Sequence, residues 1–104
     1  MGAVITGIAR TAIGKFGGTL SSLCAVELGA RAIEGALERS GLEAENVDEV
    51  LFGQVLQAGE GQITSRVAAT RAGIPMTVPA MTINKVCLSG LAAIGHADRS
   101  IRLG

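Results

Sequence analysis

Two hydrophobic patterns alternate along this chain: short β-branched runs typical of buried strands, and apolar positions three or four residues apart, typical of amphipathic helices. The runs predict strands at residues 3–9, 47–56 and 78–86. The helical spacing predicts helices at residues 24–40, 62–72 and from 87 or 88 to 103. The predicted order is therefore strand, loop, helix, strand, helix, strand, helix.

Glycine and proline punctuate this order. Gly41 is a left-handed stop for the first helix, and Gly73 with Pro75 ends the second. The glycine-rich and hydroxyl-rich segment 10–22 predicts a long surface loop. Because strands alternate with helices, we predict the α/β class, with a mostly parallel sheet built from right-handed β-α-β units.

The last predicted helix lacks a polar face in its first half, where the residues are Gly90, Leu91, Ala92, Ala93, Ile94 and Gly95. A helix that is apolar on every side is expected to be buried all round. Three strands and three helices cannot supply a second layer over it. We therefore expect residues 1–104 to form one incomplete domain of a larger fold.

Composition excludes several classes of protein. The 104 residues are 48% hydrophobic, and nine basic residues balance nine acidic ones without a basic cluster, so a nucleic-acid partner is not expected. No apolar run has membrane-spanning length, and no leader segment is visible. We read Cys24 and Cys87 as free thiols of a cytoplasmic protein. One histidine and two distant cysteines match no metal site.

The candidate chemistry lies at Cys87, where the third predicted strand meets the third helix. A sulfur in the first turn of a helix faces unpaired N–H groups, which favour thiolate over thiol and so favour covalent acyl chemistry. The competing interpretation is an inert buried thiol. As supporting residues we expect Ser89 to cap the helix, Asn84 to hold the turn, and Gly90 to permit close helix approach.

Other candidates are weaker. His96 lies nine residues after Cys87 on the same predicted helix, about 13 Å along the axis, too far to bond the sulfur, and is interpreted as a structural or surface residue. Cys24 is interpreted as a packing residue. The pair Gly59 and Gly61 lacks the third glycine and the lysine of a nucleotide loop.

Taken in order, the motifs resemble the thiolase family, which comprises acetyl-CoA acetyltransferases and 3-ketoacyl-CoA thiolases. The similarity spans the whole chain but only the opening part of a thiolase. The matching segments are Ala9-Arg10-Thr11-Ala12-Ile13-Gly14-Lys15-Phe16-Gly17-Gly18, Val26-Glu27-Leu28-Gly29-Ala30, Val47-Asp48-Glu49-Val50, Gly53-Gln54-Val55-Leu56-Gln57-Ala58-Gly59, and Pro79-Ala80-Met81-Thr82-Ile83-Asn84-Lys85-Val86-Cys87 followed by Ser89-Gly90-Leu91.

The resemblance implies the N-terminal part of a layered αβαβα fold with a buried central helix. It implies that Cys87 accepts an acyl group from acyl-CoA, for Claisen condensation or for thiolytic cleavage of 3-ketoacyl-CoA, within fatty acid metabolism. CoA thioesters are then substrates, no cofactor is tightly bound, and the full-length protein is a homodimer or homotetramer. The remaining catalytic His and Cys belong to the C-terminal half, so residues 1–104 alone are expected to be inactive.

Three positions depart from the family pattern. Leu88 follows the nucleophile where a very small residue is usual, Ala12 replaces a frequent proline, and Thr64-Ser65 replaces Pro-Ala, with either hydroxyl able to cap the second helix. Two alternatives stay open. One is a non-catalytic thiolase-like module that binds acyl chains or a partner; the other is a relative of the ketoacyl synthases, against which the segments 84–90 and 10–18 speak.

Overall fold

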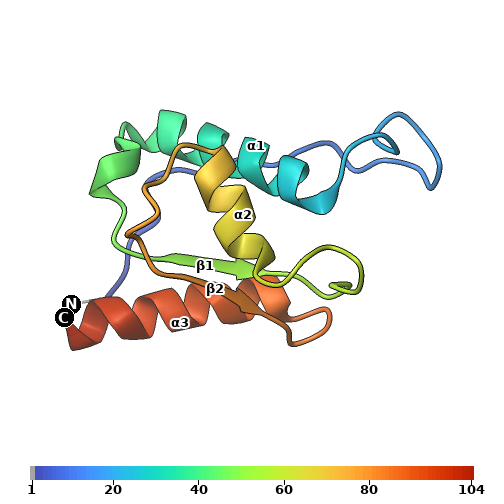
Figure 1. Cartoon of the computed structure of the whole chain (residues 1–104). Coiled ribbons are helices and arrows are strands. Elements are labelled where there is room, and N and C mark those ends of the chain that lie inside the picture. Colours follow the sequence, from blue (N-terminus) through green and yellow to red (C-terminus); the bar gives the residue numbers. More distant parts are fainter. Residues whose placement is uncertain (1) are drawn as a thin grey trace.

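A parallel two-stranded sheet separates two layers of helices in the computed structural model, which describes residues 2–104 (Figure 1). Helices α1 (Ala25–Ser40) and α2 (Thr64–Arg71) pack together on one face of the sheet. Helix α3 (Ser89–Leu103) lies across the other face and contacts both strands. The three predicted helices are thus confirmed, with ends within about two residues of those expected.

Strands β1 (Val50–Gly53) and β2 (Ala80–Ile83) run parallel, with Val50 beside Ala80 and Gly53 beside Ile83. They are shorter than the apolar runs that predicted them. Helix α2 lies in the connection between them, as a β-α-β unit requires. A short 3-10 helix, Ala44–Asn46, precedes β1 and was not predicted.

The core lies between the sheet and the α1–α2 layer. Helix α1 ends at Gly41, whose φ of 71° is left-handed as predicted, and the N–H of Leu42 returns to the carbonyl of Leu37. This closure places the apolar side of α1 over the buried cluster. The cluster consists of Val50, Ala69, Ile74 and Val78, with Ile33, Leu37, Ala44, Val47 and Ala80 packed against it.

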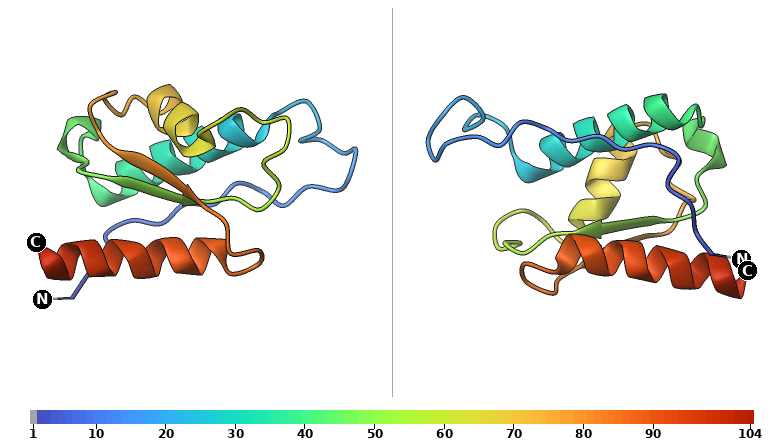
Figure 2. Two further views of the ribbon diagram at one scale, coloured as in Figure 1. Left: turned by 60° about the horizontal axis from the view of Figure 1, so that its bottom comes forward. Right: turned by 180° about the vertical axis from the view of Figure 1, so that it is seen from behind.

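The prediction of a strand at residues 3–9 is wrong for the described chain, where this segment has no regular secondary structure. This segment forms no ladder, because no neighbouring strand among residues 2–104 lies beside it. It runs along α1 instead (Figure 2), where the Ile8 carbonyl accepts a hydrogen bond from Arg39 Nη1 at 2.7 Å. The Ala3 N–H donates to Asp98 Oδ1 at 2.9 Å, which ties this segment to α3.

Within residues 2–104 helix α3 is covered on one side only, and its burial on every side was expected only in the larger fold. Its buried residues, Ser89 and Ala93, face the sheet. Leu91 and Ile94 are 65% and 56% exposed. The described chain therefore presents an open apolar helix face. No helix among residues 2–104 is both long and apolar enough to cross a bilayer.

Candidate active site

Cys87 lies in the tight turn, residues 84–88, that joins β2 to α3, and its side chain is exposed. Helix α3 begins at Ser89, so Cys87 lies two residues before the helix rather than in its first turn. The N–H groups of Gly90 and Leu91 make no hydrogen bond within the described chain, as expected for the start of a helix. The turn therefore places an accessible thiol two residues before a helix start whose first backbone donors are unpaired.

Asn84 anchors this turn to the neighbouring loop. Its Nδ2 donates to the Val55 carbonyl at 3.1 Å, and its Oδ1 accepts from the Val86 N–H at 3.0 Å. One side chain thus links the segment after β1 to the residue before the thiol. These bonds are of the kind that hold a turn in place.

Ser89 is buried and acts differently from the expected cap. Its Oγ accepts from the Lys85 N–H at 2.9 Å and donates to the Val86 carbonyl at 2.6 Å. The residue before α3 is Leu88, which makes no side-chain cap bond. The hydroxyl of Ser89 therefore closes the turn backwards instead of serving the helix N–H groups ahead of it.

The close approach of a helix at Gly90 stays a prediction, whereas the backbone of β1 approaches the start of α3 closely at Gly53. A Cβ on Gly90 would meet no atom within 4 Å in the described chain. A Cβ on Gly53, the last residue of β1, would lie 2.6 Å from the Ser89 carbonyl carbon and 2.7 Å from the Gly90 nitrogen. Only glycine lets β1 press against the start of α3 in this way. The sequence did contain a signal for this contact, because Gly53 interrupts the apolar run 47–56.

A second polar cluster lies at the start of α2. Neither Thr64 nor Ser65 caps this helix, whose N-cap residue is Ile63. Instead Thr82 of β2 accepts the Ser65 N–H at 3.1 Å and donates to Ser65 Oγ at 2.8 Å. Ser65 is only 1% exposed, so these bonds satisfy groups that water does not reach.

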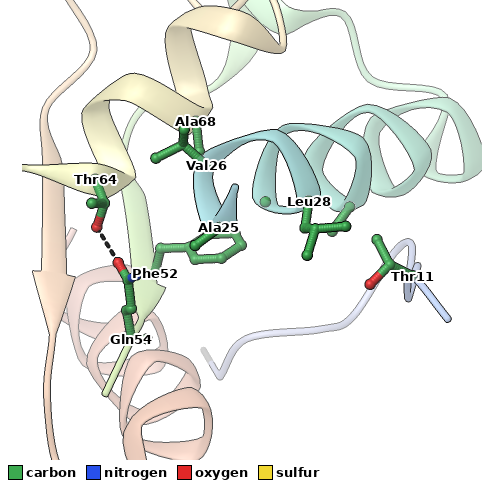
Figure 3. A pocket seen from close by; sticks show the side chains of 11 residues that line it. Thr11, Ala25, Val26, Leu28, Phe52, Gln54, Thr64 and Ala68 are labelled. Atoms are coloured by element: carbon green, nitrogen blue, oxygen red, sulfur yellow. Dashed lines mark hydrogen bonds between the residues drawn. The ribbon is translucent and has the colours of Figure 1, made fainter. Parts of the chain in front are cut away.

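The same end of the sheet borders an apolar cavity of about 280 Å³ between α1, β1 and α2 (Figure 3). The Phe52 side chain points from β1 towards α1 here, and Thr64 donates to Gln54 Oε1 at the rim. Cys87 does not line this cavity, so it is separate from the thiol turn. Its lining residues are Thr11, Ala25, Val26, Leu28, Gly29, Ala32, Phe52, Gly53, Gln54, Thr64 and Ala68.

The remaining candidate residues lie apart from the turn. His96 is exposed on α3, in agreement with a surface position. Cys24 is exposed, not packed, and its N–H donates to Glu27 Oε2 at 2.8 Å. That bond, with help from Arg71, lowers the pKa of Glu27. Among residues 2–104 no group of three His, Cys, Asp or Glu side chains is placed to hold a metal.

The fold and the turn together define a class of protein, an α/β domain that presents an accessible thiol between a parallel strand and a helix. The family model for the N-terminal domain of thiolases matches residues 3–104. The chain therefore belongs to the thiolase family, and its fold is that of the N-terminal part of a thiolase.

Individual relatives agree with this assignment. The chain is 57% identical over 101 residues to an acetyl-CoA acetyltransferase of Cupriavidus necator and 50% identical to a mitochondrial acetyl-CoA acetyltransferase of Danio rerio, in each case over 97% of this chain. The crystal structure of the Acat5 thiolase of Ascaris suum in complex with coenzyme A superposes on 96% of the chain with a TM-score of 0.94 and 39% identity. The chain spans only 24% to 26% of the length of these proteins.

Proposed function

We propose that the protein containing this chain is a thiolase-type acyltransferase in which Cys87 accepts the acyl group of acyl-CoA. One observation carries this proposal. The exposed thiol lies on a turn that Asn84 and Ser89 hold by four hydrogen bonds, in a chain that belongs to the thiolase family. The acetyl-CoA acetyltransferase names of the relatives and the coenzyme A bound to the Ascaris suum thiolase support a CoA thioester as substrate.

In the proposed reaction, the Cys87 sulfur forms a bond to the thioester carbonyl carbon. The bond between that carbon and the CoA sulfur breaks, and CoA leaves as a thiol after taking up a proton. The carbonyl oxygen becomes negatively charged on the way, and backbone N–H groups stabilise such a charge. We propose the N–H groups of Cys87 and of the α3 start as these donors, since those of Gly90 and Leu91 have no partner among residues 2–104.

The acyl group then leaves Cys87 by carbon–carbon bond formation. A second acetyl-CoA loses an α-proton to a base, and its carbanion attacks the acyl-cysteine carbonyl and releases the Cys87 sulfur. The reverse sequence cleaves a 3-ketoacyl-CoA, as in fatty acid metabolism. His96 lies seven residues, about 10 Å along the axis, past the start of α3 at Ser89, and Cys87 lies two residues before that start. We therefore propose that the base comes from outside residues 2–104. No tightly bound cofactor is needed for these steps.

The test compares two cysteine variants of the full-length protein. Cys87→Ser is expected to reduce acetoacetyl-CoA formation from acetyl-CoA by a factor on the order of 10³ or more, because the hydroxyl is a far weaker nucleophile. Cys24→Ser is the matched control and is expected to stay within about twofold of wild type, since that side chain is exposed and outside the turn. Turnover retained by Cys87→Ser would refute the proposal. Binding of acyl-CoA without turnover in the wild type would instead support a non-catalytic module.

We also propose that the full-length protein assembles as a homodimer or homotetramer without membrane or nucleic-acid partners. The open apolar face of α3, with Leu91 and Ile94 at its centre, is supporting evidence that more protein covers this layer. Light scattering of the purified full-length protein measures the assembly directly. A monomer at micromolar concentration would contradict it.

A cytoplasmic location is proposed because both cysteines of the described chain are exposed and unpaired, as in a reducing compartment. The mitochondrial name of the Danio rerio relative identifies the competing location. Cell fractionation followed by immunodetection distinguishes the two.

A further inference from the structure

The residue before the thiol has an unusual backbone. Val86 has a φ of 50°, the only positive φ of a non-glycine residue among residues 2–104. A β-branched side chain makes this left-handed region unfavourable, because its methyl groups crowd the neighbouring carbonyl. Such conformations persist only where the surroundings impose them, and they concentrate at functional sites.

Side chains impose this conformation from both ends of the residue. The Val86 N–H is held by Asn84 Oδ1 at 3.0 Å, and the Val86 carbonyl accepts from Ser89 Oγ at 2.6 Å and from the Ser89 N–H at 3.1 Å. Asn84 is itself bound to the Val55 carbonyl, and Ser89 is buried against the sheet. Both peptide groups of Val86 are therefore fixed to neighbouring structure.

The side chain of Val86 explains little of this arrangement. It is 62% exposed, so packing in the described chain does not account for the backbone geometry. What the left-handed φ does is reverse the chain between β2 and α3 within a few residues. This reversal leaves Cys87 exposed on the turn and so sets the direction of its Cα–Cβ bond.

We propose that Val86 is a positioning residue whose left-handed backbone, imposed by Asn84 and Ser89, presents the Cys87 sulfur to the acyl-CoA carbonyl. The inference rests on the proposed function and adds to it a backbone requirement. The turn needs a left-handed backbone at position 86, and it can obtain one in two ways. Either the residue adopts this conformation readily, or neighbouring side chains impose it on a residue that disfavours it. Glycine at position 86 would adopt the left-handed conformation without help from Asn84 or Ser89.

The experiment is a rescue in the full-length protein, with the rate of acetyl transfer from acetyl-CoA to Cys87 measured by rapid quench and mass spectrometry. Asn84→Ala removes the bond to the Val86 N–H and is expected to lower this rate about tenfold or more, because small misplacements of reacting groups are costly. The double variant N84A/V86G is expected to recover to within about threefold of V86G, because glycine reaches the left-handed region unaided. Asn46→Ala, at an exposed asparagine whose side chain makes no hydrogen bond within the described residues, is the matched control.

A second readout separates positioning from folding. Alkylation of Cys87 by iodoacetamide depends on the exposure and the thiolate fraction of the sulfur but not on its alignment with a bound acyl-CoA, so it is expected to change less than about twofold across the folded variants. No recovery in N84A/V86G, or a wild-type rate in N84A, would overturn the inference while leaving the proposed function intact. Absence of any acetyl-Cys87 in the wild-type protein would overturn the proposed function and this inference together.

Discussion

Helices α2 and α3 begin in opposite ways, although both start at the sheet. The start of α2 is buried, and Thr82 reaches across from β2 to pair with both the N–H and the hydroxyl of Ser65. The start of α3 is bordered by an exposed turn, and the N–H groups of Gly90 and Leu91 have no partner among residues 2–104. One start uses its polar groups to hold the scaffold, and the other leaves them available next to a thiol.

This difference shows where stability and reactivity reside in the chain. Buried polar groups must be paired, because an unpaired one loses its hydrogen bond to water and gains nothing in return. Exposed donors can stay unpaired at little cost and remain free to meet a developing negative charge. Perturbing the α2 start is therefore expected to change stability first, whereas perturbing the α3 start changes the position of Cys87.

The largest expected effect of the scaffold variants comes from Gly53→Ala, where the sheet touches the start of α3. The added Cβ would lie 2.6 Å from the Ser89 carbonyl carbon, so the helix start must shift. Overpacking of this kind typically destabilises by about 1–3 kcal/mol. We expect the acetylation rate of Cys87 to fall as well, measured together with thermal unfolding of the full-length protein.

Gly95→Ala is the control for this substitution, because a Cβ there meets no atom within 4 Å in the described chain. It is expected to keep or slightly raise the unfolding temperature, since alanine favours the helix by about 0.5–1 kcal/mol over glycine. An equal drop in unfolding temperature for Gly53→Ala and Gly95→Ala would contradict a specific requirement for glycine at position 53.

A smaller effect is expected from Thr82→Val at the buried α2 start. The substitution keeps the shape but leaves the Ser65 N–H and hydroxyl without their partner, a loss of about 1–2 kcal/mol in the free energy of unfolding. Acetylation of Cys87 is expected to change little. Thr77→Val, at an exposed threonine, serves as control within about 0.5 kcal/mol. Chemical denaturation measures the free energy of unfolding of both variants. Equal stability of Thr82→Val and Thr77→Val would contradict the stabilising role of the Thr82 hydrogen bonds.

The smallest effect is expected at the start of α1, from Glu27→Gln. The Cys24 N–H and then Arg71 lower the pKa of the Glu27 carboxyl in the folded state. Because the pKa of Glu27 is lower in the folded state than its ordinary value of 4.5, the ionised carboxylate stabilises the folded protein at pH values above 4.5. This stabilisation is lost as the pH falls through the lowered pKa. The unfolding temperature of the wild type should therefore be slightly higher than that of Glu27→Gln at pH 7. This difference in unfolding temperature should disappear as the pH falls below 4.5. Glu38→Gln, at an exposed position further along α1 whose side chain makes no hydrogen bond or ion pair within the described residues, is the matched control.

Local pattern was sufficient for the helices and for the parallel strand pair. The apolar spacing of residues 24–40 and the stop at Gly41 are properties of adjacent residues, and they place α1 correctly. The run 3–9 has the same strand-like composition as the others, yet it forms no ladder in the described chain. A strand depends on a neighbour, which the run itself does not specify.

The errors at the site have the same cause. Ser89 was assigned a capping role by its position in the sequence, but it bonds backwards to Lys85 and Val86, and the close approach to the start of α3 is made by Gly53 from another element. The left-handed backbone of Val86 gives no sequence signal, because valine is among the residues least suited to it. Contacts between distant segments decide these features.

The central claim is that Cys87 carries the acyl group. The direct measurement is acid quench of the full-length protein during turnover with acetyl-CoA, followed by proteolysis and mass mapping of every cysteine. The account predicts an acetyl group on the peptide that contains Cys87, none on the peptide that contains Cys24, and loss of the label when free CoA is added. An acetyl group located only at another residue, with turnover intact, would contradict it.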